Sequence, residues 1–136
     1  MTYCTKQDMI DRFSEQELID VTDREQLMLI NDVVLDQAIS DAAAEIDSYL
    51  GRYDLPLSVV PPVLVRLSCD IARYFLYDDM PTEQVTKRYE VAIKFLLNVA
   101  KGHIDLAQPG APSATQNLVL MQSDGSVFAR SGKGLI

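Results

Sequence analysis

The apolar residues between positions 35 and 50 recur at intervals of three and four, and this repeat is the feature that most constrains the fold. An α-helix makes one turn every 3.6 residues, so residues at these intervals lie on one side of it. Asn31 or Asp32 precedes the repeat as a candidate N-cap, and Gly51 follows it where a left-handed residue commonly ends a helix. We therefore predict an amphipathic helix with one buried face, formed by Leu35, Ala38, Ile39, Ala42, Ile46 and Leu50.

Two further stretches have the same helical period, and proline stands before each. The first is predicted over Val63–Tyr77, after Pro61 and Pro62. The second follows Pro81 and ends at Gly102. Proline is tolerated in the first turn of a helix, and glycine commonly follows the last turn. The core predicted from these stretches and the first helix consists of Leu35, Ile39, Ile46, Leu50, Leu64, Leu67, Ile71, Phe75, Ala92, Phe95, Leu96 and Val99.

The N-terminal region has the pattern of two short helices. Thr5 stands three residues before Asp8, and Ser14 stands three residues before Glu17. In such a capping box the hydroxyl accepts a free backbone N–H, and the acid reaches back to the N–H of the cap. We therefore predict an all-α fold for residues 1–102, a small bundle of four to five helices.

The composition changes after Gly102. Residues 108–113 contain two prolines and a glycine and are typical of a linker. Asp-Gly then stands between two apolar runs, which is a hairpin signal, although a helix or an extended arm stays open. We expect residues 103–136 to form a flexible C-terminal arm with the pattern of a β-hairpin, which needs a partner surface for stability. The apolar residues expected to act in assembly are Leu118, Leu120, Val127 and Phe128.

The charge of the chain is strongly negative and uneven. The chain has 20 acidic and 12 basic residues, a net charge of −8 at pH 7. Residues 1–54 hold 13 of the acidic and 4 of the basic residues, a net charge of −9. Proteins that grip DNA or anionic membranes need clustered Lys and Arg, so we expect neither role. The sequence also lacks a signal peptide pattern and an apolar stretch long enough to span a bilayer.

The pattern of reactive residues does not indicate an enzyme. His103 follows a predicted helix end, where histidine commonly meets backbone carbonyls. Cys4 and Cys69 lie far apart in no motif, which favours buried free thiols in a reducing compartment. No glycine-rich phosphate loop and no calcium-loop spacing is present. We expect no catalytic activity, no cofactor and no metal.

Asp70 and Arg73 are three residues apart on one predicted helix, a spacing at which side chains can pair. Each predicted Arg-Tyr pair, such as Arg88-Tyr89, is expected to place its arginine against a local acid. We therefore predict that Asp70, Arg73 and Arg88 form a structural polar network.

Several short segments stand in a fixed order along residues 3–102. They are Tyr3-Cys4-Thr5 with Asp8, Met9, Arg12 and Phe13; Glu17-Leu18; Ala43-Ala44-Glu45-Ile46-Asp47-Ser48-Tyr49-Leu50; Arg52-Tyr53-Asp54-Leu55-Pro56-Leu57; Cys69-Asp70-Ile71-Ala72-Arg73-Tyr74; and Arg88-Tyr89-Glu90 with Ala100-Lys101-Gly102. Together these segments resemble the Mu-like bacteriophage head–tail connector (adaptor) proteins. The ending Val127-Phe128-Ala129-Arg130 is loosely similar to the family as well.

The resemblance implies a structural protein of the phage neck, located in the virion after assembly in the host cytoplasm. Such proteins bind below the portal protein of the DNA-filled head and present a docking surface to a tail-completion or tail-terminator protein. The resemblance also implies self-association into a ring of about twelve copies, in which one face of a subunit contacts a different face of its neighbour.

The acidic region suggests one role within such a ring. If Asp36, Asp41 and Asp47 face the channel, they repel passing DNA and let it slide without sticking. The alternative is that these acids lie on a solvated outer surface. A different function, an acidic DNA-mimic inhibitor of a host nucleic-acid enzyme, also agrees with the charge. The position of the gene among head and tail genes, or among early genes, distinguishes the two functions.

Overall fold

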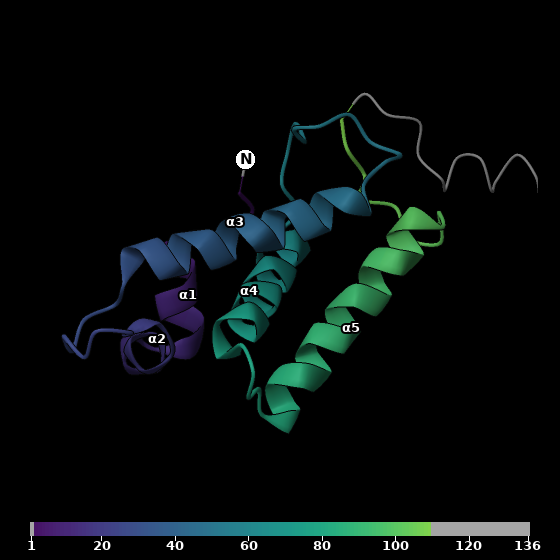
Figure 1. Ribbon diagram of the computed structural model, residues 1–136. Coiled ribbons are helices and arrows are strands. Elements are labelled where there is room, and N and C mark those ends of the chain that lie inside the picture. Colours follow the sequence, from purple (N-terminus) through teal and green to yellow (C-terminus); the bar gives the residue numbers. More distant parts are fainter. Residues whose placement is uncertain (1, 110–136) are drawn as a thin grey trace, which may run out of the picture.

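Helix α4 (Pro62–Tyr77) lies at the centre of the fold, and the other helices pack around it. The computed structural model describes residues 2–109. Helix α3 (Asp32–Ser48) crosses one side of α4, and α5 (Glu83–Ala100) runs back beside it (Figure 1). Helices α1 (Lys6–Phe13) and α2 (Glu15–Thr22) pack at the end of the bundle where α3 begins.

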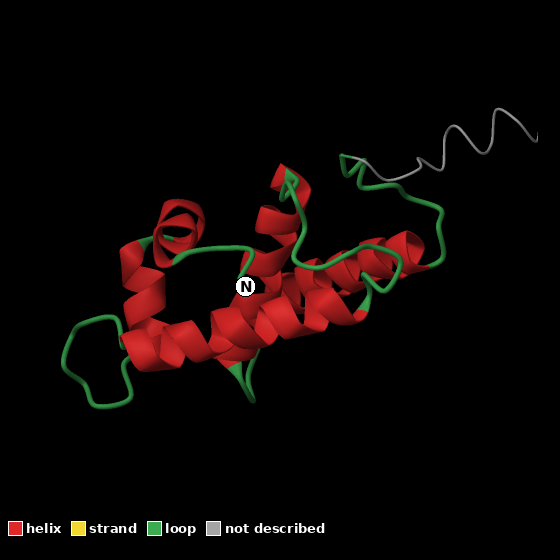
Figure 2. Cartoon of the chain, turned by 90° about the horizontal axis from the view of Figure 1, so that it is seen from above, coloured by secondary structure: helices red, strands yellow, loops and turns green. Residues whose placement is uncertain are grey.

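The helical prediction is confirmed, since residues 2–109 form five helices and no strand (Figure 2). The predicted assembly residues of the arm lie outside the described residues; they are Leu118, Leu120, Val127 and Phe128.

Side-chain caps start α1, α2 and α3 at the predicted residues, but the capping box predicted for Ser14 and Glu17 is wrong in its second half, because the Glu17 carboxylate binds Arg73 instead of the Ser14 N–H. The Thr5 hydroxyl accepts the backbone N–H of Asp8, and the Asp8 carboxylate accepts the N–H of Thr5. Asn31 caps α3 in the same way, by accepting two backbone N–H groups of its first turn. Ser14 ends α1 and caps α2, because its N–H donates to Ile10 and its hydroxyl accepts from Glu17. These caps pair donors that a helix start otherwise leaves free.

The prediction for the end of α3 is wrong in one respect. Gly51 does not adopt the left-handed conformation, and the helix ends at Ser48. Tyr49 and Leu50 instead donate to carbonyls three residues back, a tightened last turn that satisfies those carbonyls without glycine. The left-handed glycine is Gly102, with φ of 84°, where an added Cβ would collide with the Arg52 guanidinium.

Ten of the twelve predicted core residues are buried, and the exceptions are Phe75 and Phe95, which are half-buried. The buried residues of α4 form two stripes, because α4 is covered on several sides. One stripe is the predicted set of Leu64, Leu67 and Ile71. The second stripe consists of Cys69, Ala72 and Leu76, so Leu76 takes the buried place that we expected for Phe75.

The segment after α5 packs back onto the bundle. Leu106 is buried, and its N–H donates to the Tyr53 hydroxyl at 2.9 Å. Gln108 exchanges two hydrogen bonds with the backbone of Val59. The first residues of the segment expected as an arm therefore belong to the packed structure. No helix within residues 2–109 has the length and apolar content that crossing a membrane requires.

Two adjacent leucines of α5 test this packing. Leu96 is fully buried, whereas Leu97 is 42% exposed. We expect Leu96→Ala to lower the free energy of unfolding by about 2–5 kcal/mol, because it leaves a cavity. The matched control Leu97→Ala should cost at least about 1 kcal/mol less. Urea melts measure both values, and equal losses would contradict this register of α5.

Candidate functional site

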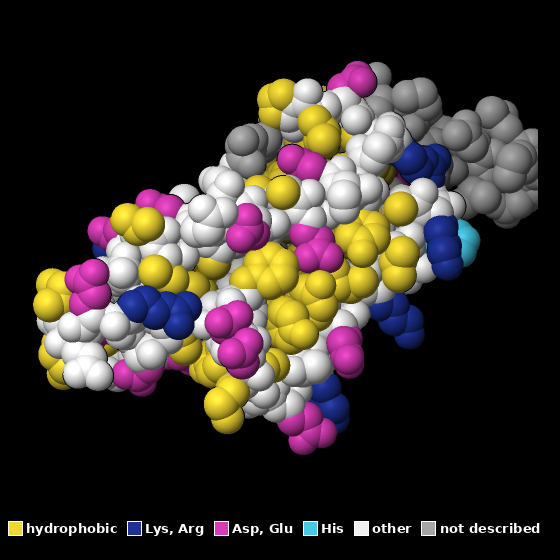
Figure 3. All heavy atoms as spheres, in the orientation of Figure 1, with side chains coloured by type: hydrophobic (Ala, Val, Ile, Leu, Met, Phe, Trp, Pro, Cys, Tyr) yellow, Lys and Arg dark blue, Asp and Glu magenta, His cyan; other side chains and the backbone are white. Residues whose placement is uncertain are grey.

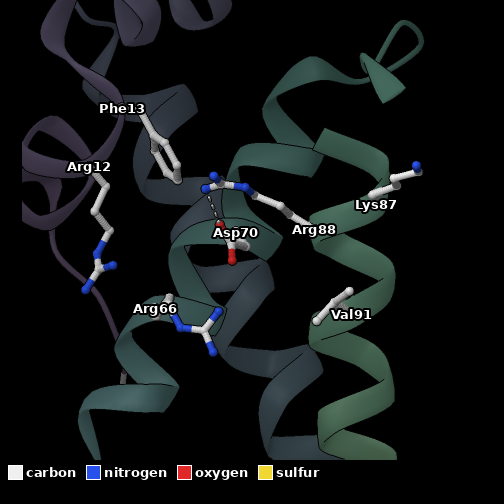
Figure 4. Close-up of a pocket in the computed structure, with 7 residues that line it drawn as sticks. All are labelled: Arg12, Phe13, Arg66, Asp70, Lys87, Arg88 and Val91. Atoms are coloured by element: carbon white, nitrogen blue, oxygen red, sulfur yellow. Dashed lines mark ion pairs between the residues drawn. The ribbon is translucent and has the colours of Figure 1, made fainter. Parts of the chain in front are cut away.

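A basic cleft lies between α1, α4 and α5 and is the candidate site of this protein. It has a volume of about 410 Å³. Figure 4 shows Arg66 and Arg88 on either side of Asp70, with the Phe13 ring beside the Arg88 guanidinium. Four of the lining side chains are basic, one is acidic and two are apolar: Arg12, Arg66, Lys87 and Arg88; Asp70; and Phe13 and Val91.

Asp70 is the carboxylate at the floor of the basic cleft, and only 6% of it is exposed. An Arg88 nitrogen lies 3.9 Å from its Oδ1, the outer limit of an ion pair. Burial raises the pKa of Asp70 above its ordinary value, against the opposing influence of Arg88, Arg66 and Arg73. Loss of water therefore outweighs the nearby positive charge, so ionisation of Asp70 in the folded chain costs stability.

The predicted direct pairing of Asp70 with Arg73 is wrong. Arg73 instead binds both oxygens of Glu17 on α2, at 2.6 and 3.2 Å. The Tyr77 hydroxyl donates to the same carboxylate at 3.0 Å, and the Arg73 guanidinium lies 4.5 Å from the centre of the Phe13 ring. A two-bond contact with a carboxylate is stronger than an i, i+3 pair on a helix surface. Of the predicted network, the structure brings together Asp70 and Arg88, and it directs Arg73 elsewhere.

The basic cleft has more positive charge than its own acid can balance. Arg12 and Arg66 have no hydrogen-bond or ion-pair partner within residues 2–109. Lys87 contacts Glu83 at 3.6 Å, but both side chains are largely exposed, and such pairs contribute little. Two guanidinium groups are therefore available to an anion from outside.

The three candidate channel acids lie on α3, but not on one face. Asp36 and Asp47 are eleven positions apart and share a side, whereas Asp41 lies about 140° around the helix from Asp36. Asp36 and Asp41 are exposed. Asp47 is half-buried and accepts the Tyr3 hydroxyl, so it ties the N-terminal segment to α3. A single channel wall cannot be lined equally by all three.

An aromatic cluster occupies the space between the three long helices. The rings of Tyr74 and Tyr89 stack at 4.0 Å, and Phe75 is tilted against Tyr89. The Tyr89 hydroxyl donates to the Glu45 carboxylate of α3. Burial is the larger cause and the Glu45 charge the smaller cause that raise the pKa of Tyr89 to about 12. Figure 3 shows hydrophobic side chains gathered between α3 and α5 on this face.

The loop between α2 and α3 exposes three apolar side chains that the sequence analysis did not single out. Leu27, Met28 and Leu29 are each more than 60% exposed. The Asp23 carboxylate holds the loop by accepting the backbone N–H groups of Leu27 and Met28, both at 2.8 Å. Apolar side chains held outward by a fixed loop are typical of a contact surface. In the sequence, the three consecutive apolar residues Leu27-Met28-Leu29 could have indicated this surface.

The reactive side chains singled out in the sequence are placed as follows. Cys4 and Cys69 are buried free thiols, as predicted, and the Ser68 hydroxyl lies 3.4 Å from the Cys4 sulfur. Hydrogen bonding to Cys4 and burial raise the pKa of Cys69. His103 follows the left-handed Gly102, and its N–H donates to the Asn98 carbonyl at 2.8 Å. Within residues 2–109, no three His, Cys, Asp or Glu side chains are grouped as ligands of a metal ion.

The Glu17–Arg73 pair is expected to stabilise the bundle. The two side chains are 22% and 12% exposed, so water screens the pair only in part. Glu17→Gln should lower the free energy of unfolding by about 1–3 kcal/mol, because it removes the charge from two hydrogen bonds. The control Glu83→Gln, in an exposed pair, should stay within about 0.5 kcal/mol of the parent. Urea melts giving equal effects would contradict a structural role for Glu17.

Asp70 gives a prediction about pH. Between its ordinary pKa of 3.8 and its raised pKa, the folded protein binds more protons than the unfolded chain, so stability falls as pH rises through this window. The Asp70→Asn variant does not lose stability in this way, because its amide does not ionise. The stability of the variant relative to the parent should therefore increase from pH 4 to pH 7, as urea melts at both values can show. A constant or decreasing difference would contradict the cost of burying Asp70.

Comparisons with known proteins agree with the Mu-like resemblance. The family described as Bacteriophage Mu, Gp36 matches residues 3–123. Gene product J of Escherichia phage Mu is 39% identical over 145 aligned positions, which cover 100% of both chains. The Mu-like prophage FluMu protein gp36 of Haemophilus influenzae is 38% identical over 138 positions, with 98% of each chain covered. With this match and this all-α fold, the chain belongs to the Bacteriophage Mu Gp36 family and is a Mu-like phage protein.

Proposed function

We propose that this protein is a structural adaptor of the phage neck, which forms a ring and joins the portal of the DNA-filled head to the tail. The observation that carries the proposal is the match with the Mu family over residues 3–123, together with the ordered segments that resemble head–tail connectors. The adaptor contacts the portal protein on one side and a tail-completion or tail-terminator protein on the other. Its place is the virion neck, which it reaches from the host cytoplasm.

The surface of the bundle supports a role in assembly. An adaptor in a ring needs separate contact surfaces for its neighbours, because ring contacts are heterologous. The bundle offers the apolar loop at Leu27–Leu29 and the basic cleft around Asp70, which are formed by different elements. Exposed apolar side chains held in a fixed conformation lose little entropy when a partner covers them.

The charge of the chain supports a position beside passing DNA. Helix α3 has five acidic residues and no Lys or Arg. A wall with this charge repels phosphate, so DNA moves past it without binding. Asp36 and Asp41 are the exposed acids that could face such a passage, and their separation around α3 leaves one of them for another contact.

Removal of the gene tests the proposed function. We expect lysates of the deletion phage to contain DNA-filled heads without attached tails, because the two halves of the particle lack their connection. Electron microscopy of the particles measures this, and the intact gene on a plasmid should restore tailed, infectious particles. Tailed particles at normal yield in the deletion phage would contradict the adaptor and favour the acidic inhibitor of a host enzyme.

The same plasmid assay tests the apolar loop. A variant with Leu27→Ser, Met28→Ser and Leu29→Ser should stay folded but fail to restore tailed particles, since these side chains are exposed in the free chain. The control Met80→Ser changes an apolar residue between α4 and α5 that is 82% exposed, and it should restore them. Full restoration by the loop variant would contradict a contact at this loop.

A further inference from the structure

Positive and negative charge are separated within the bundle. The basic cleft gathers four basic side chains around one carboxylate, although the chain as a whole has a net charge of −8. Helix α3 has the opposite character, with five acids and no base: Asp32, Asp36, Asp41, Glu45 and Asp47. An acidic protein that keeps one concentrated basic site is expected to use it for an acidic partner.

The basic cleft and the acidic side of α3 point in different directions. On α4, Asp70 faces the basic cleft, and Phe75 lies with Val34 and Ala38 of α3 in a second groove. These α4 residues are five positions apart, which is about 140° around the helix. Figure 3 shows acidic side chains along the α3 side of the molecule, and Figure 4 looks into the basic cleft. One copy can therefore offer its acids to one neighbour and its cleft to another.

The shape and chemistry of the basic cleft fit carboxylate side chains. Arg12 and Arg66 are without partners, and a guanidinium can bind a carboxylate through two hydrogen bonds. The volume of about 410 Å³ is large enough to admit an acidic side chain from a partner. The buried Asp70 lowers the affinity for a phosphate, whose charge is larger than that of a carboxylate.

We propose that the basic cleft of one copy binds the side of α3 that presents Asp36 in the next copy, with Arg12 and Arg66 contacting Asp36. The contact joins two different faces, so its repetition builds a ring when the rotation between successive copies closes. Asp36 has no hydrogen-bond or ion-pair partner within residues 2–109, whereas Asp41 lies about 140° around α3, accepts from Gln37 and stays outside the contact. This inference rests on the proposed function, because the ring is the assembly that it builds.

Charge reversal of each face tests the contact in the purified full-length chain. The first variant combines Arg12→Glu and Arg66→Glu, and the second carries Asp36→Lys. Sedimentation at low ionic strength should show association of the parent that weakens as salt is added. Each variant alone should associate at least about 100-fold more weakly, because like charges then meet.

Mixing the two variants should restore association, since the reversed cleft of one meets the reversed α3 face of the other. The chain carrying all three changes should associate with itself for the same reason. The control Arg52→Glu with Lys101→Glu changes the net charge as the first variant does, at exposed positions outside the cleft, and should associate like the parent. Circular dichroism melts verify that every variant is folded, as expected for exposed positions.

Three results would overturn the inference: a parent chain that stays monomeric at all concentrations, single variants that associate like the parent, or mixed variants that do not associate. The inference would also be overturned if the parent bound a DNA duplex and the cleft variant did not, because the cleft would then bind phosphate groups. These measurements use the isolated chain, whereas the neck function is judged by particle morphology in the deletion phage. The two proposals can therefore fail separately.

Discussion

Burial of α4 on several sides is the interaction on which the rest of the structure depends. Its two buried stripes lie on different sides of the helix: Leu64, Leu67 and Ile71 form one, and Cys69, Ala72 and Leu76 form the other. A helix enclosed in this way fixes its neighbours relative to one another, because close-packed interiors do not deform continuously. The basic cleft exists because α4 holds α1 and α5 apart at its edges.

The burial of α4 also has an electrostatic consequence. Asp70 lies on the enclosed helix, so its carboxylate loses water while the surrounding arginines reach it only from the rim. A group retained at a cost to folding is more typical of a functional surface than of a core. Asp70 at the floor limits how strongly the cleft attracts phosphate, and the arginines at its rim stay available to a carboxylate.

Much of the fold could be predicted because the deciding information is local. The apolar period of residues 35–50 and the caps Thr5 and Asn31 act within a few residues of one another. The buried residues of α4 were harder to predict, because an amphipathic pattern indicates one buried stripe and α4 buries two. The pairing of Arg73 failed for a related reason: its partner Glu17 lies 56 residues away in the sequence, and no local spacing points to it. The basic cleft likewise combines α1, α4 and α5, which only tertiary packing brings together.

The junction between α1 and α2 has a mechanical consequence. Ser14 alone connects the two helices, and each of them is hydrogen-bonded to it. No spare chain is left to absorb movement at this corner, so both helices transmit force as one rigid piece. The α1 end of that piece forms a wall of the basic cleft through Arg12, and the α2 end is fastened to α4 through Glu17 and Arg73. A load applied at Arg12 is therefore carried to the centre of the bundle by the Glu17 anchor.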